Sequence, residues 1–136
     1  MNKDLLRVIL GVVTVLVLTA RCPADEIVVV MGAGATALTK DQVAGIYLGR
    51  NNSLNPVDLA ESNPLRTAFY KRATDRDPPQ IKAIWSRLTF TGQGQPPREM
   101  PDAAAVKKAV AADPKAIGYI DKADVDASVK VVLTLN

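Results

Sequence analysis

Residues 57–69 contain side chains of the types and spacing that can hold an anion. Asn63 can cap a helix, because its side chain accepts a hydrogen bond from a first-turn N–H, and Pro64 suits the first helical position. The remaining first-turn N–H groups and the positive end of the helix dipole attract oxyanions. Ser62 can add a hydroxyl and Arg66 a guanidinium. The segment therefore predicts an oxyanion site formed by Ser62, Asn63 and Arg66.

Two carboxylates in the same segment provide a competing interpretation. Asp58 and Glu61 lie just before the expected helix. A carboxylate beside bound phosphate is repulsive unless it accepts a phosphate proton. The chain's own carboxylates can therefore take the place of the anion, and the residues alone leave both interpretations open.

A glycine-rich segment at residues 32–37 gives a second candidate loop. It matches the loose dinucleotide-binding pattern G-x-G-x-x-A, and Asp58 follows at roughly the distance of a ribose-binding acid. The next helix is better capped at Thr39 than at the glycines. Residues 1–24 also predict export, as described below, and a short exported chain fits poorly with a nicotinamide enzyme. A loop that requires small residues is favoured, with Gly34 and Thr36 as further candidates for contact with an oxyanion.

The composition excludes the common catalytic and metal-binding sets. The sequence has no histidine and a single cysteine, Cys22, so His-dependent triads and the usual zinc sites cannot form. No serine lies in a nucleophile-elbow pattern. Residues 121–126 alternate acids but lack the glycine and the distal glutamate of a calcium loop. We expect a protein that is not an enzyme and has no cofactor and no metal.

Residues 1–24 have the pattern of a secretory signal peptide. Lys3 and Arg7 precede an apolar run at residues 8–18, and small residues follow. The run is shorter than the roughly 20 residues of a spanning helix, which disfavours a membrane anchor. We therefore expect periplasmic export.

The cleavage site and the charge of the mature chain follow from the same segment. Cleavage after Ala20 and cleavage after Ala24 both stay open, and lipidation of Cys22 is disfavoured because Arg21 precedes it. Removing the segment takes three of 17 basic and one of 14 acidic residues, which leaves 14 against 13 and a net charge near +1. The remaining charges alternate in sign, so we expect no nucleic-acid binding.

The rest of the chain predicts alternating strands and helices around one core. We expect a capping box from Thr39 to Gln42 with a helix stop at Gly49, and a short strand that runs into the helix at Pro64. Further elements are strands at residues 26–31, 117–121 and 129–135, helices after Asp77 and Asp102, and a loop at residues 90–101. This order predicts one α/β domain at residues 25–136, a mixed sheet flanked by helices.

Several of these segments resemble phosphate ABC-transporter substrate-binding proteins. Residues 38–49 resemble their helix and stop, residues 66–69 the start of the helix behind their phosphate loop, and residues 113–120 a later turn and strand. Residues 85–97 look like a short single-lobe branch of the same superfamily. The resemblance implies a single lobe of a type II periplasmic binding protein that binds phosphate or another small oxyanion.

The resemblance also implies how the site departs from that family. Family members bury phosphate between two lobes, with an arginine followed by a Ser-Gly-Thr loop. Here Asp58 falls at the arginine and Asn63-Pro64-Leu65 at the loop. The implied binding is weak or depends on a partner, such as a second copy or a periplasmic or membrane transporter protein. The alternative is a periplasmic protein–protein interaction module that has lost ligand binding.

Overall fold

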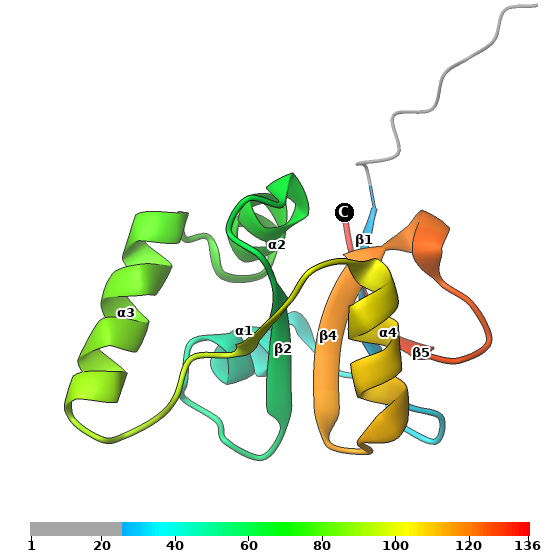
Figure 1. Ribbon diagram of the computed structural model, residues 1–136, viewed down its shortest axis with the longest axis horizontal. Helices are drawn as coiled ribbons and strands as arrows, with labels where there is room; N and C mark the ends of the chain where they lie inside the picture. The colour runs from blue at the N-terminus through cyan, green and yellow to red at the C-terminus, as the bar shows by residue number, and fades with distance from the viewer. Residues whose placement is uncertain (1–25) are drawn as a thin grey trace, which may run out of the picture.

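The computed structural model describes residues 26–136, so the expected signal peptide lies outside the described residues. A five-stranded mixed sheet, in the order β3-β2-β4-β1-β5, forms the centre of this part of the chain. The strands are β1 (Ile27–Met31), β2 (Asn55–Leu59), β3 (Arg98–Met100), β4 (Ala116–Asp121) and β5 (Lys130–Leu135). The predicted α/β fold with a mixed sheet is confirmed (Figure 1).

The strand directions decide which loops can meet. β1 runs antiparallel to both β4 and β5, whereas β2 runs parallel to β4 and β3. Met31 pairs with Ile117, and Ile117 pairs with Pro56 at the beginning of β2. The loop after β1 therefore lies at the end of the sheet opposite to the loop after β2.

The four α-helices of residues 26–136 begin at the caps that the sequence predicts. They are α1 (Lys40–Tyr47), α2 (Pro64–Thr74), α3 (Pro78–Phe90) and α4 (Ala103–Ala112), preceded by Thr39, Asn63, Asp77 and Asp102. Thr39 and Gln42 form the expected capping box. Gly49, at φ 76°, follows the end of α1, as a helix stop requires. None of the helices in the described part of the chain has the length and apolar character needed to cross a bilayer.

Helices cover both faces of the sheet at β4. Successive side chains of a strand point to opposite faces. A Cβ on Gly118 would lie 2.6 Å from Val106 Cγ1 and 2.9 Å from Val57 Cγ2, so Gly118 lets α4 pack closely on one face. Tyr119 therefore points to the other face, where it contacts rings from α1 and α2. Figure 1 shows α4 running alongside β4.

Strand β3 corrects one expectation. The sequence predicts a loop throughout residues 90–101, but Arg98–Met100 forms β3 and pairs in parallel with Val57, Asp58 and Leu59. This strand is only three residues long, follows two prolines and exposes Arg98 and Glu99. Short, charged edge strands of this kind carry little hydrophobic periodicity, which explains why the pattern does not reveal it.

Candidate functional site

A buried carboxylate lies at the end of β2, directly before the predicted anion loop. Asp58 is 2% exposed and is the sole buried polar or charged residue among the described residues. Its carboxylate accepts hydrogen bonds from the Leu59 N–H at 2.8 Å, from the Tyr70 hydroxyl at 2.5 Å and from the Tyr119 hydroxyl. These three donors surround Asp58 as they would surround a bound oxyanion.

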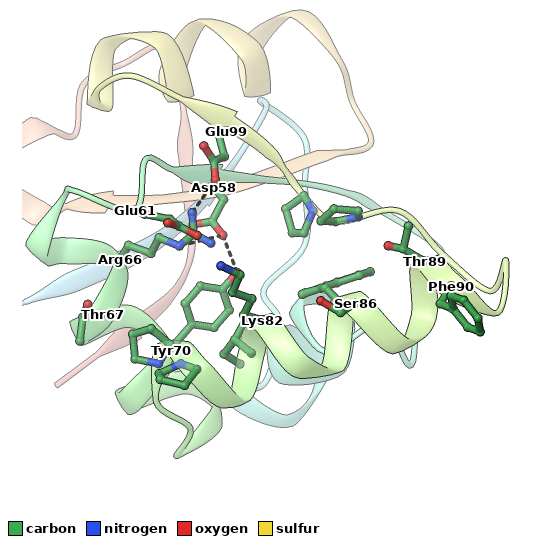
Figure 2. A pocket seen from close by; sticks show the side chains of 16 residues that line it. Asp58, Glu61, Arg66, Thr67, Tyr70, Lys82, Ser86, Thr89, Phe90 and Glu99 are labelled. Atoms are coloured by element: carbon green, nitrogen blue, oxygen red, sulfur yellow. Dashed lines mark hydrogen bonds and ion pairs between the residues drawn. The ribbon is translucent and has the colours of Figure 1, made fainter.

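The guanidinium of Arg66 is also taken up by groups of the chain itself. Its Nε lies 3.7 Å from Asp58 Oδ2, and one terminal nitrogen donates to Glu99 Oε1 and to the Leu59 carbonyl, both at 2.9 Å. Figure 2 shows the Arg66 side chain directed toward Asp58 and Glu99. The arginine of the predicted anion site therefore already has two carboxylate partners.

Burial decides the protonation behaviour of this cluster. It raises the pKa of Asp58, and this effect outweighs the opposing hydrogen bonds from Tyr119, Tyr70 and Leu59 and the charge of Arg66. Burial, followed by the charge of Asp58, also raises the pKa of Tyr70 and of Tyr119. Both tyrosines therefore remain protonated at neutral pH and act as hydrogen-bond donors.

An aromatic cluster holds the two tyrosines in place. The rings of Phe69 and Tyr119 stack with their centroids 3.8 Å apart, and Tyr47 meets Phe69 edge-on at 4.7 Å. The Tyr47 hydroxyl donates to the carbonyl of Val57 at 2.8 Å and to that of Ile117 at 3.2 Å. These contacts connect α1, α2, β2 and β4, so the donors around Asp58 are fixed by the core.

The beginning of α2 has the predicted cap, with two of its amides already bonded. Asn63 Oδ1 accepts from the Leu65 N–H at 3.0 Å, and the Arg66 N–H donates to the Asn63 carbonyl at 3.1 Å. Ser62 is exposed next to the cap. The structure thus places Ser62 and Asn63 side by side at the helix end, while the Arg66 side chain turns to Asp58 and Glu99.

The two residues expected from the glycine loop lie elsewhere. Gly34 and Thr36 follow β1 and are exposed at the end of the sheet opposite to Ser62 and Asn63. Gly34 has φ 87°, so the turn does require a glycine. The antiparallel direction of β1 relative to β2 therefore separates Gly34 and Thr36 from the candidate site at α2.

A groove adjoins the buried cluster. Its volume is about 840 Å³, and it runs along α2 and α3 to the segment before β3. Asp58 and Arg66 lie at one end, and Phe90, at the last position of α3, lies at the other with 94% of its surface exposed (Figure 2). The apolar and aromatic part of the lining consists of Tyr70, Pro78, Pro79, Ile81, Trp85, Phe90, Pro96 and Pro97.

Sequence reasoning finds part of this cluster and misses the rest. It identifies Asp58 as a possible internal occupant of the anion's place, but pairs it with Glu61, which lines the groove in an exposed position. Glu99 takes the second position at Arg66. A buried aspartate requires hydrogen-bond donors. Because Tyr70 and Tyr119 lie on elements next to β2, their hydroxyl groups were the available signal for these donors. Within residues 26–136, no group of carboxylates or other ligating side chains could hold a metal ion.

Comparison with solved structures gives the fold a context. An ABC-type phosphate transport receptor from Vibrio cholerae matches 79% of this chain at 20% identity with a TM-score of 0.60. A protein from Clostridium perfringens, described as a phosphate ABC transporter substrate-binding protein with bound phosphate, matches 79% at 19% identity with a TM-score of 0.62. The chain has the fold of part of a phosphate-binding protein. The predicted resemblance to phosphate transporter proteins is thereby confirmed for the fold.

The extent of the match bears on function. The chain spans about 45% of the Vibrio cholerae chain and 44% of the Clostridium perfringens chain. No protein-family model and no curated protein matches the sequence. Both neighbours are transport proteins by description, and more than half of each lies outside the shared fold.

Proposed function

We propose that this chain is a non-enzymatic, phosphate-binding-protein-like domain that is exported to the periplasm and acts there as an interaction module. The observation that carries the proposal is the buried Asp58 carboxylate, bonded by Leu59, Tyr70 and Tyr119 and facing Arg66. An internal anion occupies the donors that would otherwise attract a free one. On this proposal the domain keeps the fold of its neighbours but recognises a protein partner in place of a free anion.

Charge at the beginning of α2 argues against tight binding of free phosphate there. Three carboxylates, Asp58, Glu61 and Glu99, line the groove with two cations, Arg66 and Lys82, so the carboxylates are in excess. Two unit charges about 4 Å apart interact by about 1 kcal/mol in water and about 4 kcal/mol near a protein surface. A phosphate dianion would face this repulsion and would have to displace Glu99 from Arg66.

The partner that we propose is a second copy of this chain, packed groove to groove. In the resembled family a second lobe closes on the first, and each structural neighbour has more chain outside the shared fold than within it. A twofold pair would let each Phe90 insert into the apolar groove of the partner. Burying an exposed phenylalanine on each side stabilises such a pair by roughly 1.5–3 kcal/mol per ring.

Sedimentation velocity of the secreted protein tests the pairing. Mass spectrometry of its N-terminus tests the proposed export. We expect a concentration-dependent dimer that Phe90→Ser converts to a monomer. Val131→Ser is the matched control, because Val131 is the other large exposed apolar residue of the described chain and lies on β5, away from the groove. A monomer at the highest soluble concentration, or equal loss of dimer in both variants, would refute the proposal.

A second candidate function is weak or partner-dependent binding of phosphate or another small oxyanion at Ser62, Asn63 and Arg66. It is favoured by the phosphate bound in the Clostridium perfringens neighbour and by the exposure of Ser62 beside the α2 cap. Calorimetric titration with inorganic phosphate tests it, with Ser62→Ala and Arg66→Gln as variants. Heat that both variants abolish would support this site, and heat that neither changes would refute it.

A further inference from the structure

Three arginines line one small pocket on the opposite side of α3 from Ser86 and Thr89 of the groove. The pocket has a volume of about 390 Å³ and contains Arg50, Arg76 and Arg87, with an apolar remainder of Leu48, Gly49, Ile84 and Leu88. No carboxylate is among its lining residues. The pocket therefore combines a concentrated positive charge with an apolar base.

Three helix ends bring these arginines together. Arg50 follows the stop at Gly49 after α1, Arg76 follows α2 and its left-handed cap at Asp75, and Arg87 lies in the last turn of α3. These positions are far apart in sequence. Only the packing of α3 against the ends of the other two helices makes them neighbours.

The base of the pocket is rigidly packed. Trp85 Nε1 donates to the carbonyl of Tyr47 at 3.1 Å, which fixes α3 to the end of α1. A Cβ on Gly49 would lie 2.4 Å from Leu88 Cδ1 and 3.2 Å from the Trp85 ring. The backbone at Gly49 thus lies directly on α3, and the arginines project from a fixed frame.

The arginines of this pocket differ from Arg66 in their lack of internal partners. Arg66 is paired with Asp58 and Glu99. Among residues 26–136, the side chains of Arg50, Arg76 and Arg87 make no ion pair and no hydrogen bond. Of the two carboxylates adjacent to Arg76 in sequence, Asp75 and Asp77, Asp77 pairs with Lys71.

The carbonyl groups at the helix ends neutralise only part of the positive charge of the three arginines. A helix C-terminus carries roughly half a negative charge, and its effect falls off within the last turn. Guanidinium groups that share a pocket without carboxylates still repel one another. An oxyanion removes this repulsion, and the planar guanidinium donates two parallel hydrogen bonds to phosphate oxygens.

We propose that Arg50, Arg76 and Arg87 form a binding site for a phosphate group, separate from the α2 end. The ligand is either free phosphate or the phosphate of an anionic lipid headgroup, which have the same chemistry. The site is independent of Arg66, of the groove and of the proposed dimer. It gives the domain an anion-binding capacity at a place where the chain supplies no internal anion.

Titration calorimetry of the secreted protein with inorganic phosphate tests the free ligand. We expect Arg87→Gln and Arg50→Gln each to weaken binding about tenfold, which corresponds to the loss of about 1.4 kcal/mol. Arg98→Gln is the matched control, because it removes one exposed arginine from β3, outside this pocket. Phosphate bound at the α2 end would not respond to Arg87→Gln or Arg50→Gln, which separates the two sites.

Flotation with vesicles tests the lipid source. The unsubstituted protein should float with phosphatidylglycerol vesicles, and the Arg87→Gln variant should not. The unsubstituted protein should not float with phosphatidylcholine vesicles. Heat with phosphate and no flotation assigns free phosphate, and flotation without heat assigns the headgroup. The absence of both, or equal weakening by Arg98→Gln, would overturn the proposal. Thermal melts that match the unsubstituted protein establish that the variants fold.

Discussion

The Tyr119 hydroxyl donates a hydrogen bond to the Asp58 carboxylate, and this bond joins residues 61 positions apart. Tyr119 lies on β4, Asp58 on the neighbouring β2, and both are almost completely buried. Tyr70 of α2 donates to the same carboxylate. The carboxylate therefore connects two strands and a helix at the centre of the fold.

Removing one of these donors should destabilise the fold. Tyr119→Phe keeps the ring that stacks on Phe69 but leaves Asp58 with one donor fewer. A hydrogen bond to a charged group contributes about 1.5–3 kcal/mol, and we expect a loss of that size in the free energy of unfolding. Urea denaturation followed by Trp85 fluorescence measures it. A loss below about 0.5 kcal/mol would contradict the role assigned to this bond.

Asp58 should give the protein a distinct dependence on pH. Because burial raises the pKa of Asp58 in the folded chain, folding favours its protonated form. Its contribution to stability is complete below the unfolded value of about 3.9 and is lost as the pH rises through the raised folded pKa. Asp58→Asn removes this decline. The free energy of unfolding of the variant, relative to that of the unsubstituted protein, should therefore increase as the pH rises.

The control for that comparison lies within the chain. Hydrogen bonds from the Lys115 N–H and the Ser128 hydroxyl lower the pKa of Asp113 and of Asp126, which makes stability rise with pH. Both residues are present in both proteins, so subtracting the two urea curves isolates Asp58. A difference that stays constant with pH would contradict the assignment.

Arg66 should be coupled to Asp58 in a double-mutant cycle. Arg66→Gln alone leaves Asp58 and Glu99 without their cation, and we expect a loss of about 1–3 kcal/mol. In the Asp58→Asn background the same change should cost less, because the buried carboxylate is gone. The coupling expected for residues in one network is about 0.5–3 kcal/mol. Additive losses in the two variants would show that the 3.7 Å contact contributes nothing.

Two glycines should respond oppositely to alanine. A Cβ on Gly118 would lie 2.6 Å from Val106 Cγ1, so Gly118→Ala should push α4 from the sheet and cost about 1–3 kcal/mol. Gly45 lies within α1, and its nearest neighbour to a new Cβ would be Asn51 Cβ at 3.9 Å. Gly45→Ala should therefore stabilise the fold by about 0.5–1 kcal/mol. Thermal melts of both variants check the opposite signs.

Local chemistry makes most of the fold predictable. The caps at Thr39, Asn63, Asp77 and Asp102 are recognisable because each needs only its own side chain and the next turn. The apolar strands are equally clear from their β-branched runs. β3 is not predictable in this way, because its pairing with β2 depends on where the rest of the sheet lies.

The site depends on contacts that no local pattern contains. Asn63 caps α2 as its position predicts, and Asp58 is recognisable as a carboxylate in the wrong place for an anion-binding loop. Its partners Tyr70, Tyr119 and Glu99 come from three other elements. Strand direction, which separates Gly34 from Asn63, is likewise a property of the whole sheet.

The order of the strands also affects how the protein can be made. β1 is the first described strand, yet it pairs with β4 and β5, the last two. The sheet therefore cannot close until the ribosome has released β4 and β5, and such distant pairings form slowly. A polypeptide whose sheet stays open until then can still pass through a membrane as an extended chain, which suits the proposed export.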